Sequence, residues 1–82
     1  MKFTLKQLQV FLAVANHENV SQAASELAMS QSAASTALKE LEHRFGVNLF
    51  DRIGKRLQLN EQGATLRSKA AELISRAEEL ET

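Results

Sequence analysis

The 82-residue chain contains no cysteine and no proline, only three glycines, and no long apolar run. Without cysteine it can form neither disulfides nor a cysteine-ligated zinc site, which fits a reducing cytoplasm. No stretch approaches the roughly 20 apolar residues of a membrane-spanning helix, and the start lacks a signal-peptide pattern. Repeats, low-complexity tracts and Pro/Gly-rich linkers are also absent. We therefore expect one small domain with a lean core, no membrane association and a cytoplasmic location.

The chain has no net charge, but its charges are unevenly distributed. Residues 1–69 contain nine Lys or Arg and six Asp or Glu, a net charge of +3. Residues 70–82 contain one basic and four acidic residues, a net charge of −3. This polarity favours a modest electrostatic attraction of the first part to phosphate.

The pattern of polar residues does not favour an enzyme or a metal site. His17 and His43 are the only histidines, and they lie far apart without clustered carboxylates. Ser35 and His43 are eight residues apart on one predicted helix, so they face different sides and lie more than two turns apart. A serine nucleophile needs its base within hydrogen-bond reach. Gly54-Lys55-Arg56 also lacks the spacing of a phosphate-binding glycine loop.

The segment Val20–Arg44 reads as two short helices joined by a tight turn. Ser21 and Ser30 each stand where a helix N-cap is expected, with a hydroxyl that can accept a free backbone N–H. Two helices this short and this closely joined suggest a helix-turn-helix, whose second helix fits the major groove of DNA.

The second of these helices, from Gln31 to about Arg44, has one apolar and one polar face. The residues expected to pack inward follow helical spacing: Ala34, Leu38, Leu41 and Phe45. The opposite face carries Ser32, Thr36, Lys39 and His43. In the first turn, Gln31 can make the paired donor–acceptor contact that suits adenine, and Ser or Thr can serve several bases. An ordinary amphipathic helix with a solvated polar face would give the same pattern.

A basic hairpin is predicted directly after this helix. Gly46 is placed to end the helix in the left-handed conformation. Apolar residues then alternate in the segments 49–53 and 57–59, and Gly54-Lys55-Arg56 lies between them. Such a hairpin is a wing, whose cations can contact phosphates or enter a minor groove. A solvated surface loop is the alternative interpretation.

The first helix carries more apolar surface than one packed face requires, and the last helix is expected to cover the excess. Thr4 and Gln7 form a predicted capping box at the start of the first helix. The core-facing residues expected on that helix are Leu5, Leu8, Phe11, Leu12 and Ala15, and Val10 and Val14 widen its apolar arc to roughly 200°. The last helix has a short 4-3-4-3 seam of Leu66, Ala70, Leu73, Ala77 and Leu80. This seam can either pair with a second chain or pack on its own domain.

From about Leu5 to the end, the chain resembles the N-terminal signature of LysR-type transcriptional regulators. The most specific portion is SQSAAS…LE…GVNLFDR…LNEQG. The resemblance implies a mainly α fold, in which residues 1–59 form a winged helix-turn-helix of three helices plus a two-stranded wing. Residues 60–82 then form a long linker helix that dimerises. An effector-binding domain normally follows, and this chain stops before one, so a small-molecule effector would bind that missing C-terminal domain and the chain itself needs no cofactor.

Three positions depart from the family pattern. Ser32 stands where the family commonly has proline, and serine costs some rigidity at a helix start but not the helix. Thr36 stands where a long polar residue such as arginine is frequent, which puts the identity of the bases read in doubt. Asn60 replaces a common threonine, and either residue can cap the following helix.

We therefore expect a bacterial, nucleoid-associated regulator module that binds double-stranded promoter DNA as a homodimer, with tetramers open to the full-length protein. The residues expected to contact bases are Gln31, Ser32, Ser35 and Thr36. Those expected at phosphates or in the minor groove are Ser30, Lys39, Arg52, Lys55 and Arg56. The expected dimer contacts are Val10, Val14, Leu66, Ala70, Leu73, Ala77 and Leu80. The alternative is a winged helix whose Ser/Thr face docks a protein partner.

Overall fold

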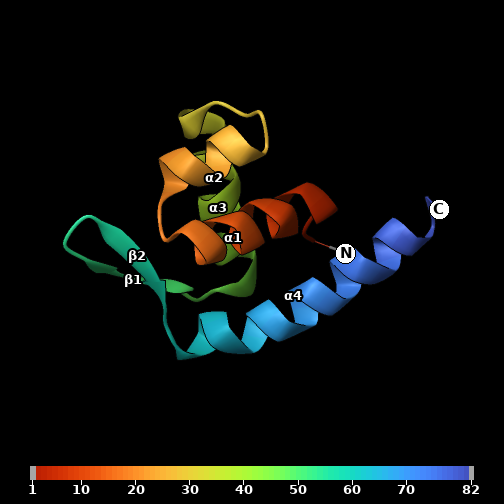
Figure 1. Ribbon diagram of the computed structural model, residues 1–82. Helices are drawn as coiled ribbons and strands as arrows, with labels where there is room; N and C mark the ends of the chain where they lie inside the picture. Colours follow the sequence, from red (N-terminus) through yellow and green to blue (C-terminus); the bar gives the residue numbers. More distant parts are fainter. Residues whose placement is uncertain (1, 82) are drawn as a thin grey trace.

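Helix α1 (Leu5–His17) is the central element of the computed structural model, which describes residues 2–81. It is followed by α2 (Val20–Glu26), α3 (Gln31–Phe45), the antiparallel strands β1 (Phe50–Ile53) and β2 (Arg56–Leu59), and α4 (Glu61–Glu79). Figure 1 shows the hairpin projecting on one side of the three-helix body, while α4 runs along the body and away from the hairpin. None of the helices within residues 2–81 is long and apolar enough to cross a membrane.

Side-chain caps determine where the helices begin. Thr4 and Gln7 form the predicted capping box, with both hydrogen bonds at 3.0 Å. Ser30 accepts from the Ala33 N–H at 3.1 Å, and this confirms it as the cap of α3. The prediction for Ser21 is wrong. Helix α2 starts earlier, because the Asn19 side chain accepts from the Gln22 N–H at 2.9 Å.

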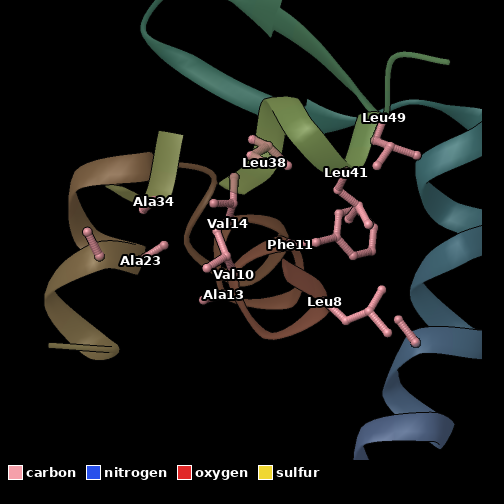
Figure 2. Packing of buried hydrophobic residues seen from close by; sticks show 12 residues of the cluster. Leu8, Val10, Phe11, Ala13, Val14, Ala23, Ala34, Leu38, Leu41 and Leu49 are labelled. Carbon is pink, nitrogen blue, oxygen red and sulfur yellow. The ribbon is translucent and has the colours of Figure 1, made fainter. Parts of the chain in front are cut away.

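The core packs against more than one side of α1. Figure 2 shows this helix nearly end-on between α2, α3 and α4, and β2 packs on it as well. Val10 and Val14 are consequently 0% exposed within the single chain, so the expectation that a second chain covers them is wrong. Leu5, expected to face the core, is 41% exposed. Leu8, Phe11 and Ala15 are buried as expected. The buried surface also extends to Val10 and Val14 and away from Leu5, because α1 has packing partners in several directions.

The apolar face predicted for α3 is mostly confirmed. Ala34, Leu38 and Leu41 are buried, and Figure 2 shows Leu38 and Leu41 above α1. Phe45 at the end of the helix is 39% exposed, so it is not the inward residue that was expected. Its ring instead contacts Phe3, with the ring centroids 5.7 Å apart, at the margin of the domain.

The hairpin is closed by a two-residue turn. Phe50 pairs with Leu59 at its base and Ile53 with Arg56 beside the turn, which leaves Gly54 and Lys55 as the loop. Gly54 has φ +61°, a conformation that glycine adopts without steric cost. At the base of the hairpin, the Phe50 ring packs on the buried Phe11 ring at 5.6 Å between centroids. The predicted hairpin is therefore present, with its base held by the core.

Backbone groups of Leu49 join α3, the hairpin and α4. The Leu49 N–H donates to the Glu42 carboxylate at 2.7 Å, and the Leu49 carbonyl accepts from the Asn60 N–H at 3.1 Å. Asn60 caps α4 by accepting from the Gly63 N–H, as predicted, and its amide also donates to the Asn48 carbonyl at 2.7 Å. The end of α3 and the start of α4 are thus fixed to each other through Leu49 and Asn60.

Candidate nucleic-acid interface

The first turns of α3 present small polar side chains to solvent. Gln31, Ser32 and Thr36 are exposed, and Ser35 is half-buried beside them. The hydroxyls of Ser30 and Ser32 lie 3.4 Å apart at the start of the helix. Because the side chains of Ser32, Ser35 and Thr36 are short, another surface can approach the α3 backbone closely here. This surface can offer hydrogen bonds to base edges.

The hairpin and α3 face each other across a groove that contains two of the predicted phosphate ligands. Lys39 and Arg52 line this groove together with Ser35 and Asn48. Lys55 is exposed in the hairpin turn. Ser35 and Lys39 of α3 and Arg52 of the wing therefore do lie on neighbouring surfaces. Asn48 belongs to this groove and was not predicted, because it lies in the loop between two regular elements.

Arg56 has a partner that no local pattern in the sequence indicates. Its guanidinium forms an ion pair with Glu18, and its Nε donates to Glu18 Oε1 at 2.7 Å. Glu18 is the residue that ends α1, 38 positions earlier in the chain. The Arg56 side chain is still two-thirds exposed. Arg56 therefore attaches the hairpin to α1, in addition to the role that was expected of it.

One residue outside the predicted set positions the interface. Glu42, on the half-buried side of α3, holds the Leu49 N–H and so fixes the loop that leads into the hairpin. Its backbone carbonyl also accepts from the Val47 N–H at 3.2 Å, next to Gly46, which ends α3 with φ +70° as predicted. The only sequence signal for Glu42 is its place in the LE pair of the family signature, which carries no information about its partner.

The predicted seam of α4 is divided between two environments. Ala70 is buried in the core of its own chain, and Leu66 is half-buried against that core together with Ile74. For Ala70 the expected dimer contact is therefore wrong, because the residue has no surface left to offer. Leu73 is 39% and Leu80 87% exposed, and Ala77 is half-buried. For these three residues, contact with a second chain stays a prediction.

The histidines lie apart. His17 Nε2 lies 2.7 Å from Glu26 at the facing ends of α1 and α2, and His43 is exposed on the outer side of α3. Within residues 2–81, no three His, Cys, Asp or Glu side chains are grouped so that they could hold a metal ion.

Sequence comparison places the chain among transcriptional regulators. The family described as "Bacterial regulatory helix-turn-helix protein, lysR family" matches residues 5–64. The HTH-type transcriptional regulator YeiE of Escherichia coli (strain K12) is 49% identical over 81 residues, which are 99% of this chain. The chain spans only 28% of the length of that relative.

Solved structures of LysR regulators have the same fold. The crystal structure of a CbnR DBD–DNA complex covers 94% of this chain and 88% of its own, with a TM-score of 0.88 and 28% identity. The crystal structure of Vibrio fischeri DarR in complex with DNA covers 95% of this chain and 27% of its own, with a TM-score of 0.88 and 35% identity. The predicted winged helix-turn-helix is thereby confirmed. The chain belongs to the lysR family of bacterial regulatory helix-turn-helix proteins.

Proposed function

We propose that this chain is the sequence-specific DNA-binding module of a transcription regulator. Its α3 enters the major groove of promoter DNA, and its hairpin lies on the backbone or in the adjacent minor groove. One observation carries the proposal: the first turns of α3 expose polar side chains beside a groove that is lined by Lys39 and Arg52. Base edges are read by such hydrogen-bonding side chains, while cations position the protein on phosphates.

Within this proposal the residues divide into two groups. Gln31, Ser32, Ser35 and Thr36 contact bases, and Ser30, Lys39, Arg52 and Lys55 contact phosphates or the minor groove. The relatives support contact with DNA in general, since related domains have been crystallised with DNA. The chain needs no cofactor for this activity and is not an enzyme. It acts on the nucleoid in the cytoplasm, and any small-molecule effector binds outside residues 1–82.

The second part of the proposal concerns the dimer. Two chains associate through α4, with Leu73, Ala77 and Leu80 at the contact. The support is the exposure of two leucines on a helix that already buries Ala70 on its own domain. Because the positive charge of residues 1–69 is modest, two DNA-binding units on one duplex are needed for tight binding.

The test uses a duplex that the protein itself selects from a random DNA library. Fluorescence anisotropy would measure binding of this duplex and of a scrambled duplex at several salt concentrations. Counterion release predicts that log K falls linearly with log salt, by roughly 0.9 per phosphate neutralised. The proposal would be overturned if the protein selected no sequence from the library, or if its affinity for DNA did not depend on salt. A module that docks a protein partner would then be favoured.

A further inference from the structure

Glu18 occupies a backbone conformation that a glycine would adopt more easily. It ends α1 with φ +56° and ψ +28°, in the left-handed region. Residues with a Cβ are strained there, and glycine is the usual residue after a helix end. Glu18 and Ala28 are the two non-glycine residues with positive φ within residues 2–81. Strained backbone positions often coincide with functional contacts, so the contacts of the Glu18 side chain bear on its role.

The contacts of Glu18 are with the hairpin. Its carbonyl accepts from the Leu57 N–H at 3.0 Å, and its carboxylate accepts from Arg56 Nε at 2.7 Å and also from Arg56 Nη2. One residue at the end of α1 therefore holds two successive residues of β2. Phe50, by contrast, attaches the base of the hairpin through its ring contact with Phe11.

Arg56 lies close to the tip of the hairpin, so its attachment to Glu18 can control the direction of the tip. Arg56 pairs with Ile53, which is the last pair before the Gly54–Lys55 turn. Ile53 and Lys55 are exposed, so the tip itself has little packing to fix its direction. The ion pair with Glu18 is thus the attachment nearest the tip.

We propose that Arg56 is a positioning residue: its ion pair with Glu18 fixes the direction of the hairpin and so places Lys55 for its contact with DNA. The inference rests on the proposed DNA-binding function. It differs from the sequence-based expectation, in which Arg56 contacts phosphate or the minor groove directly.

The two roles predict opposite effects of removing the Glu18 carboxylate. If Arg56 is a DNA ligand held back by Glu18, then Glu18→Ala frees a cation and removes a repelling charge, and DNA binds more tightly. If Glu18 positions the hairpin, the same substitution weakens binding although the protein becomes more positive. We expect binding to weaken about two- to fivefold, the range that corresponds to an exposed ion pair.

The experiment measures DNA affinity for Glu18→Ala, Arg56→Ala, the double variant and the exchanged pair Glu18→Arg with Arg56→Glu. We expect similar losses in both single variants, no further loss in the double variant, and recovery to within about twofold in the exchanged pair. Glu26→Ala is the charge-matched control, because Glu26 pairs with His17 and not with the hairpin. It should bind DNA as tightly as the unaltered chain or more tightly.

A further measurement separates positioning from loss of stability. Lys55→Ala should weaken binding less in the Glu18→Ala background than in the unaltered chain, because Lys55 is already misplaced there. Thermal melts would show that every variant is folded at the assay temperature. Tighter binding by Glu18→Ala, or an undiminished effect of Lys55→Ala in that background, would overturn the inference. Failure of the unaltered chain to bind DNA would instead overturn the proposed function.

Discussion

Gly63 shows how closely α4 approaches the loop before the hairpin. A Cβ at this position would collide with the Leu49 carbonyl oxygen and would lie 2.7 Å from Leu59 Cδ2. The Leu49 carbonyl already accepts a hydrogen bond from Asn60, so it has little freedom to move. The need for glycine here is therefore one of space rather than of backbone conformation.

Replacing Gly63 with alanine should destabilise the domain by about 1–3 kcal/mol or more, because the added methyl group meets backbone rather than a flexible side chain. At this chain length each kcal/mol lowers the melting temperature by about 4–8 °C. Circular dichroism melts would measure the change. Ala64→Ser, at an exposed neighbouring position, is the control and should cost about 0.5 kcal/mol or less. An unchanged melting temperature for Gly63→Ala would contradict the described approach of α4 to Leu49.

At Gln31 we predict a loss of sequence discrimination without a loss of stability. Gln31 is exposed and starts α3, and neither the Ser30 cap nor the buried Leu38 depends on its side chain. Gln31→Ala should weaken binding of the selected duplex by roughly 1–3 kcal/mol and leave scrambled DNA nearly unaffected. Gln62→Ala, an exposed glutamine on α4, is the matched control. An unchanged ratio of the two affinities in a folded variant would mean that Gln31 reads no base.

At the scale of single elements, the hairpin should contribute affinity without sequence preference. Lys55 lies in the exposed turn, and phosphates are the same at every site. Lys55→Ala should weaken the binding of selected and scrambled DNA about equally. It should also reduce the magnitude of the slope of log K against log salt by about one. Lys6→Ala, on the exposed side of α1, serves as the control and should leave the slope unchanged. If Lys55→Ala keeps the full slope, the turn does not reach the DNA backbone.

Local signals predicted most of these elements. Thr4, Ser30 and Asn60 marked helix starts because a cap depends on residues within one turn of it. Ser21 failed as a cap because Asn19, two positions earlier, can make the same hydrogen bond and does so. The alternating apolar residues predicted the hairpin, and Gly54 predicted its turn.

Contacts between distant parts of the chain were out of reach of such signals. No local spacing links Glu18 to Arg56 or Glu42 to the Leu49 backbone. The burial of Val10 and Val14 was misjudged for a related reason. A wide apolar arc on a helix indicates several neighbours, but it does not say whether they belong to the same chain or to another one.

For the whole molecule, the prediction concerns association through the exposed side of α4. Leu73 lies about 60° around the helix from the buried Ala70, at 100° per residue, so it can be changed without entering the core. Leu73→Glu combined with Leu80→Glu should convert a dimer into a folded monomer and weaken binding to a duplex with two half-sites by at least tenfold. Analytical ultracentrifugation would measure the mass.

The control for this variant adds the same charge elsewhere on α4. Ala71→Glu with Ser75→Glu changes two exposed positions on the opposite side of the helix from Leu80. This protein should sediment as the unaltered chain does. If the leucine variant also remains a dimer at micromolar concentration, the dimer contact lies elsewhere on the molecule.

The fixation of Leu49 between Glu42 and Asn60 has a geometric consequence for such a dimer. In the proposed dimer, α3 and α4 of each chain are tied to the same residue, so each chain would move as one rigid arm about the contact between the two α4 helices. Two such arms reach successive major grooves on one side of a duplex only if their α3 helices are about 34 Å apart, or a multiple of that distance. A small change in the angle at the pivot therefore becomes a larger displacement at α3. The angle between the two α4 helices would in this way decide which spacings of half-sites the protein can occupy.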